Sequence, residues 1–237
     1  MARIVLVTGG NRGIGREVVR QVAQRGDVAL LGARDVERAR GEADAADQVA
    51  TAADHGGRVE AVPLDVTDPD SVAQAVRQVD EHHGRIDALV NNAAIHYDTW
   101  QRGADVDLGV VAEAFGTNVL GAWRVAQAFL PLLRRSDHPR LVNVSSQAGS
   151  LASMGAGTPA YAVTKAALNA LTRVLADELR SDRVLVNAIC PGWTATDMGG
   201  RGGRPVAAGA ASIVWAVALP DDGPTGGFFR DGRALPW

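Results

Sequence analysis

The sequence of 237 residues is short of two residue types that most proteins use freely, because it has one cysteine, Cys190, and one lysine, Lys165. A single cysteine excludes an internal disulfide and favours a reducing compartment. No apolar run approaches the ~20 residues that span a bilayer, and the first residues lack the pattern of a signal peptide. We therefore expect a cytoplasmic protein with no membrane partner.

An excess of charge of one sign is also missing. The formal net charge is −3, which gives no reason to expect nucleic acid as a partner. No group of His, Cys, Asp and Glu has the spacing of metal ligands, so we predict no metal site. The length and the hydrophobic content of 46% suit one domain with a substantial core.

Short β-branched runs alternate with longer helical stretches along the chain. The strand runs are apolar almost throughout, as in parallel sheets that helices cover on both faces. The sequence therefore predicts an α/β fold, a single doubly wound (Rossmann) domain over residues 1–237 with a seven-stranded parallel sheet flanked by helices on both faces. Strands are expected at 3–8, 27–33, 58–66, 85–94, 140–146, 183–192 and 226–232, and helices at 13–26, 35–57, 68–84, 119–133 and 161–179.

The segment TGGNRGIG, residues 8–15, follows the first predicted strand and opens the first helix. Glycine lets the backbone turn tightly and approach a pyrophosphate, and the helix N-terminus supplies free N–H groups. Such a turn alone is a weak signal, and the spacing of Gly9, Gly13 and Gly15 differs from the widespread GxGxxG pattern. Its place between the first strand and the first helix nevertheless predicts a dinucleotide site.

The residues after the second strand bear on which dinucleotide is bound. An acidic residue there binds the 2′-hydroxyl of NAD, whereas arginine suits the 2′-phosphate of NADP. Arg34 follows the strand and Arg12 lies in the glycine-rich segment, and both can form paired hydrogen bonds to phosphate. Asp35 competes, but it also suits the N-cap of the next helix. We predict NADP(H); the alternative is that both arginines are ordinary surface residues.

The segment YAVTK, residues 161–165, holds the only lysine and one of the two tyrosines. Four positions apart in a helix, Tyr161 and Lys165 share a face. An ammonium beside a phenol lowers the phenol pKa from ~10, which suits proton transfer near neutrality. An isolated pair of this kind is usually incidental, but the hydroxyls of NVSSQAG, residues 143–149, follow the fifth strand at the ligand-binding edge of such a sheet.

In order and at matching intervals, these motifs resemble those of the short-chain dehydrogenases/reductases, and within them the carbonyl-reductase-like NADPH-dependent enzymes. The resemblance covers nearly the whole chain. It rests on TGGNRGIG, ARD at 33–35, LDVTD at 64–68, LVNNAA at 89–94, TNVLG at 117–121, VNVSS at 142–146, YAVTK, and PGWTATDM at 191–198.

The resemblance implies a role for each matching residue. Tyr161 would be the general acid, and Lys165 would bind the ribose hydroxyls and lower the Tyr161 pKa. Ser146 would bond to the substrate oxygen, and Asn118 would hold a water of the proton relay. Ser145 is a weaker candidate, because alternation along the strand turns it away. The cofactor would also contact Gly9, Asn11, Arg12, Gly13, Ile14, Gly15, Arg34, Asp65, Val66, Asn92, Ala93, Pro191, Gly192 and Thr196.

The substrate pocket is less well specified than the cofactor site. Segment 150–160 is slightly longer than in many relatives, so we expect it to bulge and to change the shape of the pocket rather than the catalysis. Packing or surface exposure would explain each candidate lining residue equally well. These candidates are His96, Tyr97, Trp100, Met154, Trp193, Met198 and Phe228.

The predicted function is NADPH-dependent reduction of a ketone or aldehyde to an alcohol, with hydride from the cofactor and the proton from Tyr161. One alternative is an NAD(P)-dependent secondary-alcohol dehydrogenase that works in the oxidative direction. Another is a non-catalytic NADPH-binding regulator, which the presence of all four catalytic residues disfavours.

Two predicted helices, 119–133 and 161–179, carry few charges on any face. A sheet covers only one side of such a helix, so a second subunit would cover the other. The resemblance to the short-chain dehydrogenases/reductases points the same way, because many members of that family form dimers or tetramers through these helices. We expect a homodimer or homotetramer.

Overall fold

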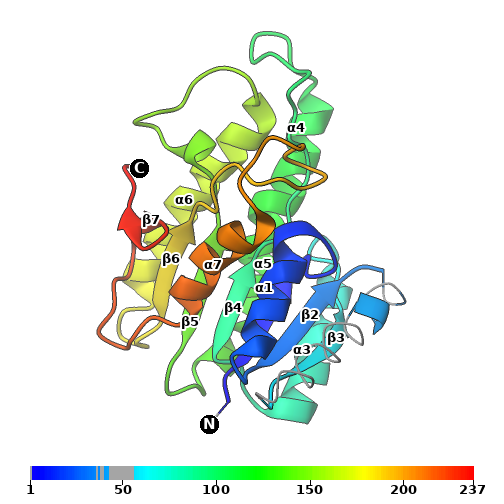
Figure 1. Ribbon diagram of the computed structural model, residues 1–237, viewed down its shortest axis with the longest axis vertical. Helices are drawn as coiled ribbons and strands as arrows, with labels where there is room; N and C mark the ends of the chain where they lie inside the picture. The colour runs from blue at the N-terminus through cyan, green and yellow to red at the C-terminus, as the bar shows by residue number, and fades with distance from the viewer. Residues whose placement is uncertain (1, 36, 38–39, 43–55) are drawn as a thin grey trace.

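A twisted sheet runs through the middle of the protein (Figure 1), in a computed structural model that describes residues 2–35, 37, 40–42 and 56–237. Within these residues the strand order is β3-β2-β1-β4-β5-β6-β7-β8, and only β8 is antiparallel to its neighbour. The strands are β1 (Ile4–Thr8), β2 (Val28–Ala33), β3 (Arg58–Pro63), β4 (Ala88–Asn91), β5 (Arg140–Val144), β6 (Leu185–Ile189), β7 (Phe228–Arg230) and β8 (Arg233–Ala234).

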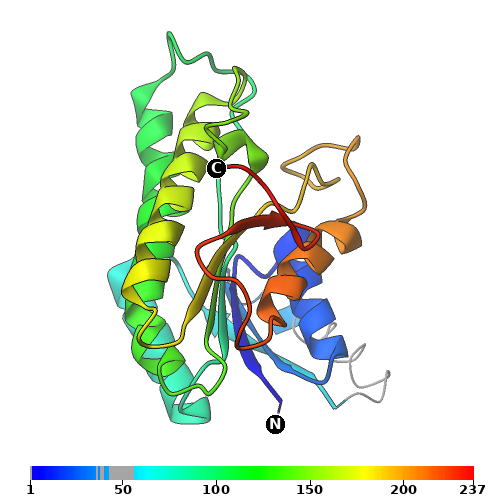
Figure 2. The ribbon, with the colours of Figure 1, turned by 90° about the vertical axis from the view of Figure 1, so that its left-hand side faces the viewer.

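Helices cover both faces of the sheet, as Figure 2 shows in the edge-on view. Side chains alternate between the two faces of a strand: Ile4 and Leu6 of β1 join one apolar cluster, and Val5 and Val7 join the other. The first cluster packs under α3, α5 and α6, and the second under α1 and α7. The helices are α1 (Gly13–Gln24), α3 (Pro69–His83), α4 (Leu108–Phe115), α5 (Ala122–Leu133), α6 (Pro159–Glu178) and α7 (Val206–Val217).

The predicted fold class is confirmed, with one correction to the sheet. The described residues form an eighth strand, because Asp231 and Gly232 turn the chain back onto β7 with φ of +50° and +73°. An Asp-Gly pair between short strands is a typical hairpin signal, so the sequence contained this information.

The helix boundaries also need corrections. The predicted helix 119–133 becomes α-helical only at Ala122, after a π-helical turn over Gly116–Gly121. Helices α4 and α7 were not predicted, and most of the predicted helix 35–57 lies outside the described residues. Helix α3 has a side-chain N-cap, since Asp68 accepts a hydrogen bond from the N–H of Asp70.

The order of the strands fixes where a ligand can bind. After β1 the chain passes to α1 on one face, and after β4 it passes to the helices of the other face. Adjacent strands whose connections leave in opposite directions open a crevice at their carboxyl ends. The crevice of this protein therefore lies above β1 and β4.

Candidate active site

A cleft of about 640 Å³ lies at the carboxyl edge of the sheet, as the topology requires. It brings together residues from the ends of six strands. Among the predicted cofactor residues Gly192 does not line it. Those that do are Gly9, Asn11, Arg12, Gly13, Ile14, Gly15, Arg34, Asp65, Val66, Asn92, Ala93, Tyr161, Lys165, Pro191 and Thr196.

The glycine-rich turn packs directly against the end of β4. A Cβ on Gly15 would lie 2.3 Å from the carbonyl oxygen of Gly9 and 2.5 Å from Nδ2 of Asn92, so no side chain fits there. Asn92 Nδ2 donates to the Thr8 carbonyl at 2.8 Å. Gly13, with φ of +51°, begins α1, whose first turn carries no acidic side chain. These features suit a pyrophosphate at the helix N-terminus.

Thr8 is a structural residue of this turn that the sequence analysis missed. Its buried Oγ1 accepts hydrogen bonds from the backbone N–H groups of Asn92 and Ala93, both at 3.0 Å. This contact joins the ends of β1 and β4 beside the crevice. A hydroxyl directly before a Gly-Gly pair was the available signal.

Arg12 and Arg34 both line the cleft with exposed side chains. Neither guanidinium forms a hydrogen bond or ion pair with another described residue, whereas the side chain of the neighbouring Arg16 pairs with Glu42 at 3.3 Å. Two cations without a protein counter-charge, at the end of β2 and at the start of α1, suit an anionic group such as the 2′-phosphate of NADP.

Helix α6 carries the predicted catalytic pair. Lys165 is 2% exposed, and its Nζ donates a hydrogen bond to the Val144 carbonyl at 2.7 Å. Nζ also lies 5.4 Å from the centre of the Tyr161 ring. Burial disfavours the charged ammonium and lowers the Lys165 pKa to about 8.

Burial acts on Tyr161 in the opposite sense and raises its pKa, because the phenolate would be poorly solvated. A side-chain hydrogen bond with Ser146 opposes this and lowers the pKa. We expected Lys165 to lower the Tyr161 pKa. In the structure its ammonium bonds to the Val144 carbonyl instead of the phenol oxygen. Tyr161 is therefore held in its protonated form.

The structure separates the two candidate serines. Ser145 lies 1% exposed and donates its hydroxyl to Asn169 Oδ1 at 2.5 Å, behind α6. Ser146, one residue later, contacts the Tyr161 hydroxyl and also accepts the N–H of Ala148 at 3.2 Å. Ser146 is the serine whose hydroxyl meets the phenol.

Asn118 lies in the π-helical turn, is 1% exposed and is not among the residues that line the cleft. Its Oδ1 accepts from the N–H of Ile95 at 2.8 Å, and its Nδ2 donates to Thr164 Oγ1 at 3.1 Å. The Thr164 hydroxyl in turn donates to the Tyr161 carbonyl at 2.8 Å. Through its side chain, Asn118 joins the segment after β4 to α6.

The predicted substrate residues divide into two groups. His96, Tyr97, Trp100 and Met198 line the cleft, and the Tyr97 ring meets the Tyr161 ring edge-on at 5.1 Å.

Three predicted substrate residues do not line the cleft. Trp193 donates its Nε1 to the Gly199 carbonyl at 2.7 Å, because loop 193–204 folds on itself. Phe228 is buried against Trp237. Met154 lies in the irregular segment 150–158, away from the cleft.

No group of three His, Cys, Asp or Glu among the described residues could hold a metal ion. No helix in the described part of the chain is long and apolar enough to cross a membrane.

Known proteins with similar sequences cover nearly the whole chain. The carbonyl reductase [NADPH] 1 of Sus scrofa is 32% identical over 99% of this chain and 94% of its own length. The (+)-neomenthol dehydrogenase of Capsicum annuum is 30% identical, over 96% of this chain and 95% of its own length.

Solved structures agree with the sequence comparison. The NADPH-bound carbonyl reductase from chicken fatty liver superposes with a TM-score of 0.85 and 29% identity, over 100% of this chain and 99% of that one. A family model described as short chain dehydrogenase matches residues 3–204. The predicted resemblance is confirmed, and the protein belongs to the short-chain dehydrogenase family.

Proposed function

We propose that the protein is an NADPH-dependent oxidoreductase that reduces a ketone or aldehyde to an alcohol. The observation that carries this proposal is the protonated Tyr161, held beside Ser146 in a cleft that also presents Arg12 and Arg34. The relatives named carbonyl reductase and neomenthol dehydrogenase support the same class of reaction.

NADPH supplies the hydride when it is bound, and the residues of the chain supply position and the proton. Arg12 and Arg34 bind the 2′-phosphate, and the turn at Gly13 receives the pyrophosphate. Lys165, whose ammonium now bonds to the Val144 carbonyl, would hold the ribose hydroxyls, for which a compact ammonium is better suited than a planar guanidinium.

Tyr161 acts as the general acid. Ser146 donates a hydrogen bond to the substrate oxygen and orients it toward the phenol, and Tyr161 then gives its proton to that oxygen. The Tyr161 anion that results is stabilised by the Ser146 hydroxyl and by the nearby Lys165 ammonium. Asn118, which joins the segment after β4 to α6, would hold a water through which the phenol regains its proton.

The raised pKa of Tyr161 keeps the phenol protonated, which suits the general-acid role in reduction. The alternative is NAD(P)-dependent oxidation of a secondary alcohol by the same residues. It would require a pH at which the phenol ionises.

The proposal is tested by following NADPH oxidation with a panel of ketones, aldehydes and quinones. We expect turnover with at least one carbonyl class, and loss of that turnover in Tyr161→Phe while NADPH still binds. Near-normal turnover in Tyr161→Phe would remove the general-acid role. A protein that binds NADPH but turns over no carbonyl would be the non-catalytic regulator instead.

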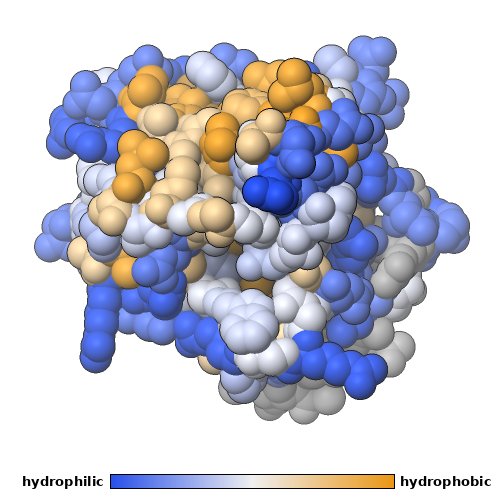
Figure 3. All heavy atoms as spheres, turned by 90° about the horizontal axis from the view of Figure 1, so that it is seen from above, coloured by the Kyte–Doolittle hydropathy of each residue, from blue (hydrophilic) through white to orange (hydrophobic). Residues whose placement is uncertain are grey.

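We also infer that two or four copies associate through α5 and α6. Leu120 of the π-helical turn, Trp123 of α5, and Val163 and Val174 of α6 are exposed. Seen from above, the molecule also carries apolar side chains gathered on its upper face (Figure 3). Covering such side chains would stabilise a dimer. A monomeric mass in light scattering at micromolar concentration would refute this.

The proposal also includes a cytoplasmic location. The one cysteine, Cys190, is a buried free thiol, which is typical of a reducing compartment.

A further inference from the structure

Helix α6 begins without a cap from its own first residues. The Thr158 side chain forms no capping hydrogen bond, and Pro159 has no N–H to offer. The next two N–H groups, those of Ala160 and Tyr161, precede the first that can bond within the helix. The helix that carries Tyr161 therefore needs a hydrogen-bond acceptor from elsewhere in the chain.

That acceptor is Asp98, which lies more than fifty residues earlier, in the segment between β4 and α4. Its Oδ2 accepts from the N–H of Ala160 at 2.8 Å, and its Oδ1 accepts from the N–H of Tyr161 at 3.0 Å. Each carboxylate oxygen thus takes one donor, and one of the two donors is the backbone of the catalytic residue itself.

Asp98 is 0% exposed, and no Lys, Arg or His of the described residues forms an ion pair with it. A buried carboxylate without a cation is costly unless other groups stabilise it. Here the two N–H groups and the positive end of the α6 dipole supply that stabilisation. A carboxylate so placed is suited to holding this helix end in one position.

Residues 95–98 also contact the ring of Tyr161 and are linked to its carbonyl. The Tyr97 ring meets the Tyr161 ring at 5.1 Å with an interplanar angle of 82°. Ile95 is bonded to Asn118, which is linked through Thr164 to the Tyr161 carbonyl. Residues 95–98 therefore contact the N–H, the ring and, indirectly, the carbonyl of Tyr161.

We propose that Asp98 is a positioning residue for Tyr161, and that it makes segment 95–98 and the start of α6 one rigid unit. This inference rests on the proposed function. Tyr97 belongs to the same unit and lines the cleft, so the substrate wall and the phenol keep a fixed geometry. A small displacement of a proton donor slows reaction strongly, by up to ~100-fold per ångström.

Two substitutions test the proposal in the full-length protein. Asp98→Ala removes both acceptors, and Asp98→Asn keeps one acceptor and removes the charge. We expect kcat to fall about 10- to 100-fold in Asp98→Ala and less in Asp98→Asn, with the Kd of NADPH within about twofold of wild type. The deuterium isotope effect on kcat with 4-deuterated NADPH should rise, because hydride transfer becomes slower relative to product release.

The matched control is Asp107→Ala. Asp107 lies nine residues after Asp98 and caps α4 by accepting the N–H of Gly109 at 2.7 Å, but no hydrogen bond or ion pair joins its side chain to α6 within the described residues. This variant should keep kcat within about twofold of wild type. Because both variants lose a helix cap, the comparison separates positioning of Tyr161 from general loss of stability.

Three results would overturn the proposal. One is a kcat within about twofold of wild type in both Asp98 variants. The second is a loss of kcat with an unchanged isotope effect and a matching loss of NADPH-binding sites, which indicates unfolded protein. The third is an equal loss in Asp107→Ala. If Asp98→Ala does not fold, Asp98→Asn decides between these results.

Hydrogen exchange separates this inference from the proposed function. We expect the amides of Ala160 and Tyr161 to exchange faster in Asp98→Asn, and to be unchanged in Asp107→Ala, whatever the activity. A wild-type protein that reduces no carbonyl would refute the proposed function. An active wild-type protein whose Asp98→Asn variant shows unchanged kcat and unchanged exchange would refute the positioning role alone.

Discussion

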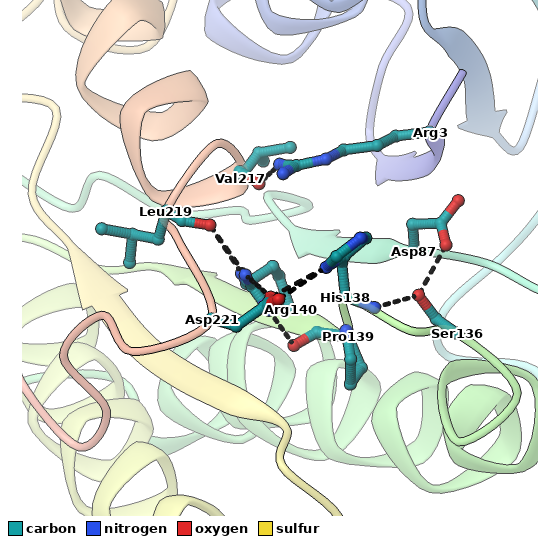
Figure 4. A network of polar contacts seen from close by, with 9 residues as sticks. All are labelled: Arg3, Asp87, Ser136, His138, Pro139, Arg140, Val217, Leu219 and Asp221. Atoms are coloured by element: carbon teal, nitrogen blue, oxygen red, sulfur yellow. Dashed lines mark hydrogen bonds and ion pairs between the residues drawn. The ribbon is translucent and has the colours of Figure 1, made fainter. Parts of the chain in front are cut away.

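Arginine side chains at the two edges of the sheet differ in whether they have hydrogen-bond partners within the protein. At the amino edge, Arg140 at the start of β5 is 1% exposed and fully engaged within the chain (Figure 4). It donates to the Leu219 carbonyl at 2.7 Å, to the Pro139 carbonyl at 3.1 Å, and to the Asp221 carboxylate at 2.7 Å. At the carboxyl edge, the guanidinium groups of Arg12 and Arg34 bond to no other described residue.

The charged residues near Arg140 also have hydrogen-bond partners within the protein. Arg140 and then His138 lower the Asp221 pKa to about 2. Asp87 accepts hydrogen bonds from the Ile4 N–H and the Ser136 hydroxyl. Groups that satisfy one another stabilise the fold, whereas cations left with free donors around a cleft are available to a ligand. The difference separates residues kept for stability from residues kept for binding.

The largest expected effect is on kcat/KM, when Lys165 at the carboxyl edge is replaced. Lys165→Arg keeps the charge but replaces a compact ammonium by a planar guanidinium in a fully buried position. We expect kcat/KM to fall about 100-fold or more, measured by NADPH oxidation. Arg180→Lys, an exposed exchange two residues after the end of the same helix, should change kcat/KM little. An active Lys165→Arg enzyme would show that this site needs only a positive charge.

The next effect concerns stability at the amino edge. Arg140→Met leaves the Leu219 carbonyl and part of Asp221 without their donor, so we expect about 2–3 kcal/mol less unfolding free energy. The measurement is urea unfolding of the purified variant. Arg134→Met, which breaks an exposed ion pair with Asp182, should lose less than about 1 kcal/mol. If both variants lost the same unfolding free energy, the buried, fully hydrogen-bonded Arg140 would contribute no more to stability than the exposed Arg134.

A third effect concerns cofactor choice at the carboxyl edge. Arg34→Asp removes a phosphate-binding cation and adds a repelling charge, so we expect KM for NADPH to rise about tenfold or more. KM for NADH should change little or fall. Arg58→Asp, at the start of β3 on the opposite edge, is the control and should leave both values unchanged. If Arg34→Asp kept its preference for NADPH, the 2′-phosphate would be recognised elsewhere.

The smallest effect is in the pH dependence. Lys165 has a pKa lowered to about 8 by burial, so its charge is present below that pH and is lost as pH rises through it. Carbonyl reduction that needs the ammonium should therefore fall by about half at pH 8 and further above it. A pH profile of kcat/KM measures this. A flat profile from pH 7 to about 9 would contradict it.

Local sequence patterns were sufficient for most of the fold. Apolar runs predicted the strands, because both faces of a parallel sheet are buried. The turn at Gly13 and Gly15 was predictable because a tight turn and a close backbone approach require glycine whatever surrounds it. Asp231-Gly232 also carried its hairpin signal locally. The π-helical turn around Asn118 was not predicted, because its hydrogen bonds span five residues, whereas the apolar periodicity of the sequence indicates an α-helix with bonds that span four.

The contacts of the site were decided by the tertiary structure. The sequence indicated Tyr161, Lys165 and Ser146, but only the fold showed that burial raises the pKa of Tyr161 and lowers that of Lys165. It also showed that the Ser145 hydroxyl bonds to Asn169. The role of Asp98 depends on a helix start that lies far along the chain.

Residue type and local spacing therefore determined which chemistry the chain can perform, since backbone turns and strand periodicity depend on near neighbours. Solvation and hydrogen-bond partners depend on residues brought together by folding. Strand alternation already favoured Ser146 over Ser145, but only the tertiary structure could decide which carboxylate holds the helix of Tyr161.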